Sequence, residues 1–308
     1  RKEFPCVAVI VIASNNVIIY DGDDPDMPMW MVFPADAYIT WASTSDTGTS
    51  CVSALNSKLF IGNSNDYGDC IVDFVSDDTR LVYNNNNYAL TKRTVVDRNI
   101  LESTEFPLYY AGGDGYNIVN PSVNDVAMTV LPNAPIDPDT GLPVPTIAVA
   151  TNGGVSVIKD DGTVVDITYT NYTGSNEVKF LPSGGLVYTT DANANQRWIH
   201  VDHTLPSSDL NKNDTGYKGL LDDEMYHLVN TSTYSGQDLK LRIDNSAGGF
   251  IVDNSGDVVL GSTASSNGGL GFISRNASSP SEGLTCEITS SHNTGWMHGD
   301  IKLATLSD

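Results

Sequence analysis

Apolar residues along this chain occur in short runs that are rich in β-branched and aromatic side chains. Most runs are bounded by Asn, Asp, Gly or Ser. Runs of this length and composition favour strands over helices. Helical periodicity is scarce, and 27 glycines and 14 prolines supply frequent turn signals. The pattern therefore predicts an all-β fold.

Two pairs of apolar runs have the pattern of β-hairpins. The first pair is Val7–Ala13 and Val17–Tyr20, with Asn15-Asn16 between them. The second pair is Val155–Ile158 and Val164–Ile167, with Asp161-Gly162 between them. Asp-Gly between two apolar runs is typical of a type I′ turn. The second pair is the clearest single hairpin in the sequence.

Paired glycines open several of these runs, and similar text follows them. The pairs are Gly112-Gly113, Gly153-Gly154, Gly184-Gly185 and Gly248-Gly249. After each of the last three pairs comes a strand-like run and then an acidic turn. Self-similarity with a period of about 40 to 45 residues is typical of a β-propeller, which has four strands in each blade.

These repeats predict one β-propeller domain over residues 1–308, with about seven blades and a range of six to eight. We expect the termini to close in one blade, in which Ile301–Leu306 completes the sheet begun by Val7–Ile12. A rival is a β-sandwich after Asp202, with 211–219 as a linker. The stretch 132–145 is interpreted as a long loop between strands, because strand-like Thr146–Ala150 follows it directly. Residues 84–87 and 91–105 do not match the repeat and indicate a short helix or an inserted loop.

Charge limits the partners of the chain. It has 16 Lys and Arg against 38 Asp and Glu, a formal net charge of −22. Nucleic acid is not expected, because binding phosphates requires clustered cations. Membrane insertion is not expected either, because no apolar stretch approaches the roughly 20 residues of a spanning helix. The acidity is spread along the chain, as is typical of a surface that resists non-specific association.

The cysteines and glycine-rich stretches indicate no cofactor site. The four cysteines are too far apart for a Cys-x-x-Cys pair, and we expect Cys6, Cys51 and Cys70 to be buried free thiols because of their apolar surroundings. The stretch 112–115 lacks the Lys-Ser/Thr of a phosphate loop, and there is no Gly-x-Ser-x-Gly. We therefore expect no cofactor.

Two clusters have the residue types of metal ligands. Asp21–Asp26 resembles a calcium loop but lacks the register and the distal Glu of an EF-hand. We interpret it as a solvated turn and keep calcium near Asp21 to Asp26 as the alternative. His200 and His203 are the one close histidine pair, but on a strand end their rings would point in different directions. We therefore assign no metal ligand.

Signals for catalysis are weak. Thr44–Gly48 resembles one imperfect copy of the Ser-x-Asp-x-Gly-x-x-Trp turn of sialidases, and His292–Trp296 has its Trp too close to its Gly. Chance pairs among the 38 acidic residues leave another hydrolase open. The Asn-x-Ser/Thr triplets at Asn171, Asn213, Asn230 and Asn276 are expected by chance in a chain of this composition. No catalytic residue is assigned.

Aromatic and methionine side chains are candidates for contact with sugars or proteins, with packing between blades as the favoured alternative. Met27–Met31 is a pliable apolar stretch that fits either an inner strand or a docking surface. The aromatic candidates lie near expected strand ends or loops: Trp30, Trp41, Tyr109, Tyr110, Tyr116, Tyr217, Tyr226 and Trp296.

Four stretches, Pro5–Val11, Ile19–Phe33, Pro145–Asp166 and Gly295–Asp308, resemble structural proteins of marine tailed bacteriophages, which are tail fibre or tail-associated proteins. The resemblance implies a virion location in a tail appendage. It also implies a segment of a longer chain, because in such proteins a propeller-like region is commonly followed by lectin-like modules. It supplies no catalytic motif.

These observations together predict a non-enzymatic virion module, a rigid platform for assembly or for contact with a host-surface glycan or protein. We expect other virion proteins as partners and a homo-oligomer within a longer assembly. One alternative is a secreted propeller glycoside hydrolase or lyase, which a cleft with two carboxylates and a raised pKa on one of them would favour. Another is a bacterial surface adhesion module.

Overall fold

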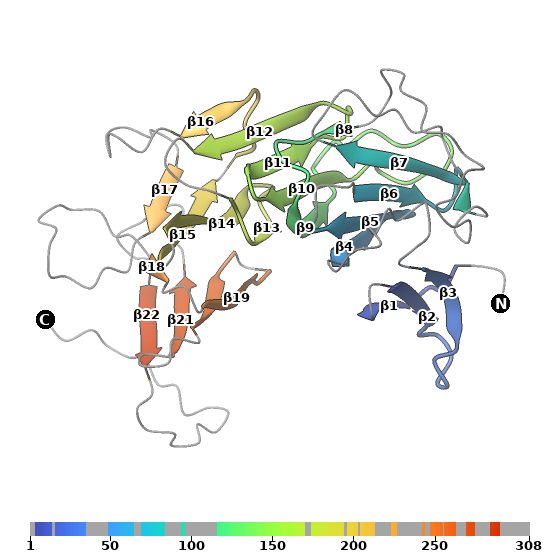
Figure 1. Ribbon diagram of the computed structural model, residues 1–308, viewed down its shortest axis with the longest axis horizontal. Coiled ribbons are helices and arrows are strands. Elements are labelled where there is room, and N and C mark those ends of the chain that lie inside the picture. Colours follow the sequence, from blue (N-terminus) through green and yellow to red (C-terminus); the bar gives the residue numbers. More distant parts are fainter. Residues whose placement is uncertain are drawn as a thin grey trace, which may run out of the picture.

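The computed structural model in Figure 1 is built from strands. The described part of the chain contains five sheets and no α-helix, which confirms the all-β prediction. In that part no helix is long and apolar enough to cross a membrane. The structure describes residues 4–13, 16–34, 49–64, 69–83, 94–95, 116–169, 174–193, 196–202, 204–212, 223–226, 242–243, 247–254, 256–262, 269–274 and 284–289.

The first two sheets use the N-terminal part of the chain. The first has the order β1-β2-β3, and the second has the order β4-β5-β6-β7-β8, in which β7 and β8 pair in parallel. The strands of the first sheet are β1 (Ala8–Ala13), β2 (Asn16–Asp21) and β3 (Met29–Phe33). Those of the second are β4 (Thr49–Leu55), β5 (Lys58–Asn63), β6 (Asp69–Asp73), β7 (Asp78–Tyr83) and β8 (Tyr116–Asn117).

The third sheet occupies the middle of the molecule and has the order β16-β12-β11-β10-β9. Adjacent strands within this sheet pair antiparallel, except β12 and β16, which pair in parallel. Its strands are β9 (Val123–Thr129), β10 (Thr146–Thr151), β11 (Gly154–Ile158), β12 (Val164–Tyr169) and β16 (Leu210–Lys212).

The last two sheets contain the C-terminal strands. The fourth has the order β13-β14-β15-β17, with β18 also paired to β15, and the fifth has the order β19-β20-β21-β22. The fourth sheet comprises β13 (Val178–Phe180), β14 (Leu186–Asn193), β15 (Gln196–Asp202), β17 (Asp223–Tyr226) and β18 (Arg242–Ile243). The fifth comprises β19 (Ala247–Val252), β20 (Val258–Ser262), β21 (Gly269–Ser274) and β22 (Leu284–Thr289).

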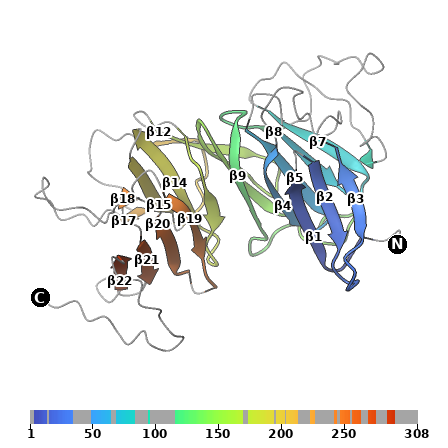
Figure 2. The ribbon, with the colours of Figure 1, turned by 60° about the horizontal axis from the view of Figure 1, so that its bottom comes forward.

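The five sheets follow one another along an arc in the order of the sequence (Figures 1 and 2). The first strand of each sheet touches the first strand of the next, so β1, β4, β9, β13 and β19 form the inner row. The sheets β1–β3 and β19–β22 lie at the two ends of the arc. The structure describes a succession of sheets and no closed ring.

Apolar residues fill the spaces between successive sheets. One cluster joins the first two sheets, another joins the second and third, and a third joins the third and fourth. In β10, Ile147 and Val149 face the second sheet while Ala148 and Ala150 face the fourth, so that every residue of this strand is buried. The apolar runs of the middle sheet therefore come from strands that are covered on both faces.

Both predicted hairpins are confirmed, because β1 pairs with β2 and β11 with β12, each antiparallel. The predicted type I′ turn is wrong. Of the turn residues 160–162, only Gly162 has a positive φ, of 84°, and its N–H donates to Lys159 O. The loop is a type I turn followed by a left-handed glycine, the usual geometry when three residues separate the strands.

The predicted loop 132–145 is confirmed as the connection between β9 and β10. The paired glycines, in contrast, take unlike positions. Gly154 begins the third strand of its sheet, Gly184 lies in the turn before β14, and Gly248 is next to a bulge in β19. The spacing of these pairs therefore does not mark equivalent points of successive sheets.

The chain after Asp202 continues sheets that began earlier. β16 extends the third sheet beside β12, and β17 and β18 pair with β15. These pairings do not fit a separate sandwich that begins after Asp202. The expected closing strand 301–306 and the stretches 84–87 and 213–219 lie outside the described residues, as does 91–105 apart from Thr94 and Val95.

Candidate functional site

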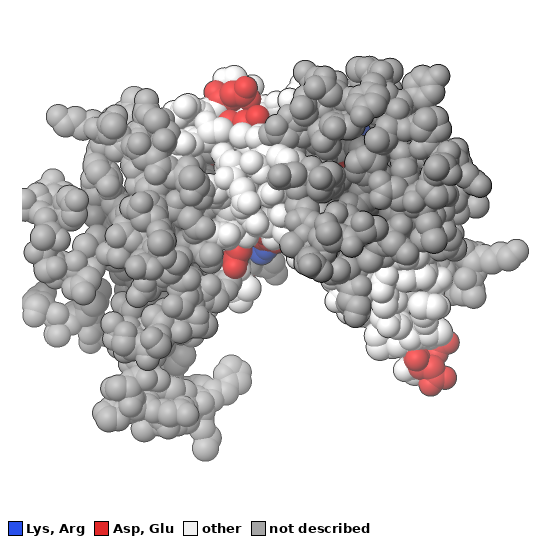
Figure 3. All heavy atoms as spheres, viewed as in Figure 1, with Lys and Arg blue, Asp and Glu red and all other residues white. Residues whose placement is uncertain are grey.

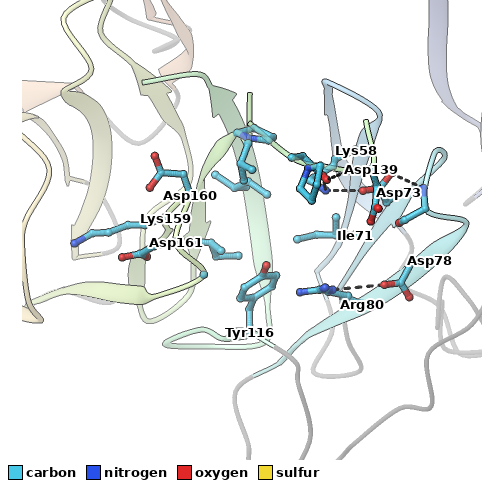
Figure 4. A pocket seen from close by; sticks show the side chains of 18 residues that line it. Lys58, Ile71, Asp73, Asp78, Arg80, Tyr116, Asp139, Lys159, Asp160 and Asp161 are labelled. Carbon is cyan, nitrogen blue, oxygen red and sulfur yellow. Dashed lines mark hydrogen bonds and ion pairs between the residues drawn. The ribbon is translucent and has the colours of Figure 1, made fainter. Parts of the chain in front are cut away.

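A cleft of about 350 Å³ lies between the second and third sheets. One wall comes from β5, β6 and β7, the other from the turn between β11 and β12, and the loop between β9 and β10 reaches the cleft from above in the view of Figure 4. Its floor is apolar and belongs to the core between these sheets: Ile71, Ile147 and Ile158.

The loop 130–145 is held by its own backbone. Asp137 N donates to Leu142 O at 2.9 Å, Gly141 N donates to Asp137 O at 2.8 Å, and Val144 N donates to Pro135 O at 2.8 Å. The Asp137 carboxylate also accepts from Asp139 N at 3.0 Å. These bonds fix the backbone that carries Asp137 and Asp139 at the cleft.

A second set of contacts fastens this loop to the neighbouring sheet. Asn56, in the turn between β4 and β5, donates from Nδ2 to Pro143 O at 2.8 Å. Lys58 Nζ lies 2.5 Å from Asp73 Oδ2 and 3.6 Å from Asp137 Oδ2. Lys58 therefore links the wall and the loop, and its charge is already matched by two carboxylates.

Asp73 is the most strongly held carboxylate of the cleft. Burial works against its ionised form, but hydrogen bonds from Lys58, Val75 N and Ser57 prevail and lower the pKa of Asp73 below its ordinary value. Asp73 is therefore an anion at neutral pH. Its role is to orient Lys58 and the turn after β6.

The rest of the cleft combines charge with one aromatic ring. Arg80 Nε lies 3.7 Å from Asp78 Oδ2, its side chain is 52% exposed, and its head group points toward Tyr116 in Figure 4. In the opposite turn, Asp161 accepts from Thr163 Oγ1 and N, and these bonds lower the pKa of Asp161. Lys159 points away from the cleft (Figure 4).

The cleft is therefore rich in hydrogen-bond acceptors. Its described lining contains six aspartates and three basic residues but no His or Cys. Among the described residues, none donates a hydrogen bond to the carboxylate of Asp139 or of Asp160. An acceptor-rich wall, a Tyr ring and an apolar floor suit a ligand with many hydroxyl or amine donors. The groups of this lining that could act as a nucleophile or a base are its carboxylates.

A carboxylate with a raised pKa occurs elsewhere in the third sheet. Burial raises the pKa of Asp166, a hydrogen bond from Ser156 Oγ at 2.6 Å opposes the rise, and the nearby Asp209 carboxylate adds to it. Asp209 also accepts from Asp166 N at 3.0 Å. Neither Asp166 nor Asp209 lines the cleft, so this pair does not form the arrangement expected of a hydrolase there.

The acidic turn at 21–26 has a structural use. Both oxygens of Asp23 accept backbone N–H groups, from Cys6 at 2.8 Å and Val7 at 3.0 Å, and so hold the entry to β1. Asp21 and Asp24 accept from N–H groups two residues further on. Among the described residues no group of three His, Cys, Asp or Glu is arranged to hold a metal ion.

His200 belongs to a buried network between the third and fourth sheets. Its Nε2 is 2.8 Å from Thr190 Oγ1, and its ring stacks on Tyr188 with centroids 5.1 Å apart. The Tyr188 hydroxyl lies 2.7 Å from that of Tyr169 and donates to Asp202 at 3.1 Å. Sequence reasoning treated His200 only as a metal candidate and missed this network. His203 lies outside the described residues.

The aromatic candidates separate into packing and cleft residues. Trp30 makes edge contacts with Phe4 and Phe74, whereas Tyr116 lines the cleft. Met29 is 60% exposed and Met31 packs into the first core cluster. Tyr226 lies in β17, and Trp41, Tyr109, Tyr110, Tyr217 and Trp296 lie outside the described residues, as do 44–48, 112–115 and 292–296.

The cysteine prediction is partly wrong. Cys51 and Cys70 are buried free thiols as expected, and burial raises the pKa of each far above its ordinary value. Cys6 is exposed, because it precedes β1 at the edge of the first sheet. The two buried thiols are thus poor nucleophiles.

No protein-family model and no curated protein matches the chain. Among solved structures, it is similar to the major allergen Mala s 1 of Malassezia sympodialis, with a TM-score of 0.42, 11% identity and coverage of 92% of this chain and 75% of that one. A protein of unknown function from Bacteroides caccae is similar with a TM-score of 0.34 and 10% identity, over 89% of this chain and 69% of that one. Hsv2 of Kluyveromyces lactis is similar with a TM-score of 0.28 and 12% identity, over 92% of this chain and 94% of that one. These likenesses assign no family.

Proposed function

We propose that this chain is a non-enzymatic binding module of a phage tail, a rigid platform for virion assembly or for contact with the host surface. The observation that carries the binding role is the cleft between the second and third sheets. Its walls are fixed by Lys58, Asp73 and Asp137 before any ligand arrives, which lowers the cost of binding. Its described lining offers hydrogen-bond acceptors and a Tyr ring.

The architecture proposed for the platform is a β-propeller of about seven blades, within a range of six to eight. Successive sheets that meet through their first strands support this proposal. Residues 301–306 are proposed to join the sheet of β1–β3, so that both termini share one blade and no sheet edge is left open. Residues 1–308 then form one domain.

The virion location rests on the resemblance of four sequence stretches to phage structural proteins. In that setting the partners are other virion proteins and a host-surface glycan or protein, and the chain works as a homo-oligomer in a longer assembly. A large net negative charge suits an exposed appendage, because it opposes non-specific association.

The test is a panel of glycans and polysaccharides, with binding and the release of reducing ends both recorded for the purified chain. We expect saturable binding without cleavage. Asp139→Asn removes an acceptor at the cleft, and Tyr116→Ala removes the ring. Each is expected to weaken binding about tenfold, the loss of one hydrogen bond to a charged group or of one stacking contact.

The matched control is Asp26→Asn, which removes one exposed carboxylate in the turn between β2 and β3. Equal weakening by Asp26→Asn and Asp139→Asn would show that net charge and not the cleft governs binding. Release of reducing ends would replace the proposal with a propeller glycoside hydrolase or lyase. Absence of binding across the panel would reject glycan recognition.

A further inference from the structure

Arg80 lies on a sheet face whose other side chains belong to the core. It is a residue of β7, and its cross-strand partner in β6 is Ile71. On this face of the second sheet, Phe60, Ile71 and Val82 pack in the core between the second and third sheets. Side chains two residues apart in a strand share a face, so Arg80 points to the same side as Val82. Arg80 therefore lines the cleft at the edge of this core (Figure 4).

The guanidinium of Arg80 has donors available for a ligand. Its described contact is with Asp78, from Nε to Oδ2 at 3.7 Å, and its side chain is 52% exposed. Neither terminal nitrogen has a hydrogen-bond partner among the described residues. The other basic residues of the lining differ, because Lys58 is matched by two carboxylates and Lys159 points away from the cleft. Within the described lining, Arg80 is thus the cation that can donate into the cleft.

Such a cation is unusual on this molecule. The chain has 16 Lys and Arg against 38 Asp and Glu. On the described surface in Figure 3, acidic side chains form patches while basic ones are scarce. Carboxylates are therefore plentiful, yet the terminal nitrogens of Arg80 are not paired with one among the described residues. Its position serves the cleft more than it serves internal ion pairing.

Tyr116 is a second fixed element of the cleft. Its backbone pairs with Val82 of β7, and its ring packs against the core between the second and third sheets. A Cβ on Gly162 would be 4.0 Å from Tyr116 Cε1, so the ring stands beside the turn between β11 and β12. The head group of Arg80 points toward this ring in Figure 4. A ring held in this way can receive the apolar face of a sugar.

The cleft makes three different demands on a ligand. Its floor of Ile71, Ile147 and Ile158 accepts a small apolar group. Arg80 has only donors and therefore selects an acceptor, whereas ionised Asp139 has only acceptors and selects a donor. A volume of about 350 Å³ lies near the lower end of the usual range for ligand pockets, about 300–1,000 Å³, which suits one sugar unit.

Charge limits which acceptor can meet Arg80. Six aspartates against three basic residues give the described lining a formal excess of three negative charges, which repels a carboxylate. An ammonium group would be attracted by the aspartates but would leave the donors of Arg80 unused. An acetamido group has an uncharged carbonyl acceptor, an N–H donor and a methyl group. It therefore meets all three demands in a single substituent.

We infer that the ligand of the cleft is a neutral sugar with an acetamido group, and that Arg80 selects this group. The inference rests on the binding role proposed above and names its ligand. Arg80 donates to the amide carbonyl, the methyl group lies on the apolar floor, and the sugar ring lies along Tyr116. Asp139 accepts from the amide N–H or from a ring hydroxyl.

A matched series of methyl glycosides tests the ligand class. Glucose, glucosamine and N-acetylglucosamine present a hydroxyl, an ammonium and an acetamido group at C2, and the three galactose counterparts repeat the series with the other configuration at C4. NMR titration of the purified chain gives the dissociation constants. In at least one series, we expect the acetamido sugar to bind about tenfold more tightly than the other two, because it adds a hydrogen bond to a charged group and a buried methyl. In saturation-transfer NMR its methyl protons should receive the largest saturation.

A matched pair of variants tests the role of Arg80. Arg80→Met keeps an apolar stem but removes the donors, and Lys159→Met makes the same change in a side chain that points away from the cleft. Arg80→Met should weaken binding of the acetamido sugar about tenfold and of the hydroxyl sugar less than about threefold. Lys159→Met should change either by less than about threefold. Arg80→Lys keeps the charge without the planar fork and should fall between the wild type and Arg80→Met, which keeps the test available if Arg80→Met does not fold.

Four results overturn the inference. The acetamido sugars bind no more tightly than the hydroxyl sugars; the ammonium sugars bind most tightly; Arg80→Met weakens all sugars equally or no more than Lys159→Met does; or other glycans bind but none of these six does. In each case the chain still binds a glycan, so the proposed binding role survives without this ligand. Absence of binding by these six sugars and by the wider glycan panel would reject glycan recognition and this inference together.

Discussion

Gly62 of β5 lies between Cys51 of the neighbouring strand and Val123 of the third sheet, and its replacement by alanine is expected to destabilise the fold. A Cβ at this position would be 2.6 Å from Cys51 Sγ and 2.8 Å from Val123 Cγ1. Non-bonded heavy atoms of this kind prefer about 3.5–4.0 Å. Cys51 and Val123 are 8% and 0% exposed, so neither side chain has solvent to move into. One or both of these side chains, or the backbone that carries them, must therefore shift.

The magnitude follows from two opposing effects. Overpacking of a core costs about 1–3 kcal/mol. Removing a glycine stabilises the folded state by about 0.4–1 kcal/mol, because the unfolded chain loses freedom. Packing prevails, and Gly62→Ala is expected to lower the free energy of unfolding by roughly 1–2 kcal/mol. In urea titrations the midpoint should fall while the m-value stays unchanged.

A double-mutant cycle assigns the cost to this contact. Cys51→Ala removes the nearer of the two atoms and leaves Val123 in place. In that background Gly62→Ala is expected to cost about half as much, a coupling of roughly 0.5–1 kcal/mol. The reasoning is refuted if Gly62→Ala is as stable as the wild type, or if it costs the same with and without the thiol.

Two further predictions concern buried polar groups, both measured by urea unfolding. Tyr188→Phe removes the hydroxyl that joins Tyr169 and Asp202 and should cost about 1–3 kcal/mol, whereas Tyr20→Phe, at a half-buried position of β2, should cost far less. Burial raises the pKa of Asp69, so the folded state holds this proton to higher pH than the unfolded chain. The raised pKa therefore lowers the free energy of unfolding. This loss of stability is absent below about pH 3.9, where the carboxyl is protonated in both states, and grows as the pH rises toward the folded pKa. The free energy of unfolding of Asp69→Asn should therefore match that of the wild type near pH 3 and exceed it at about pH 7. A stability difference that is the same at both pH values would contradict this.

Local patterns in the sequence predicted local structure well. The hairpins β1–β2 and β11–β12 follow from alternating runs and the turn residues between them. The error at 160–162 has a local cause, because Asp-Gly is compatible with a two-residue loop and with a three-residue loop. Only the register of the strands, Ile158 with Val164, decides between the two loops.

Long-range spacing was a weaker guide. A glycine pair marks a place where backbone must turn or pass closely, and such places occur at several points of a sheet. Gly154, Gly184 and Gly248 satisfy this need in three different contexts. The division of the chain into sheets therefore does not follow from their spacing, and β16, which returns to the third sheet in parallel, has no local signal at all.

The cleft was not found from the sequence because its parts are far apart in the chain. Lys58, Arg80, Tyr116 and the turn at 160–162 meet only when the second and third sheets pack. Of these residues, the sequence indicates only Tyr116 as a candidate for ligand contact, as one of several aromatics near expected strand ends or loops. The loop 132–145 was recognised as a loop, but its Asp137-Pro138-Asp139 stretch gave no indication that Lys58 of another sheet would bind it.

The acidity of the chain does more than keep its surface charged. Asp23 holds the backbone before β1, and Asp125 accepts from Val178 N and pairs with Lys179 at 2.5 Å, which joins the third sheet to the fourth. Asp73 and Asp137 engage Lys58 in the same way between the second sheet and the loop. Basic residues are few, and those at the junctions of sheets are matched by carboxylates. In the proposed binding role, the remaining carboxylates, such as Asp139 at the cleft, are the groups that would meet a ligand, which favours an uncharged or amine-bearing ligand over an anionic one.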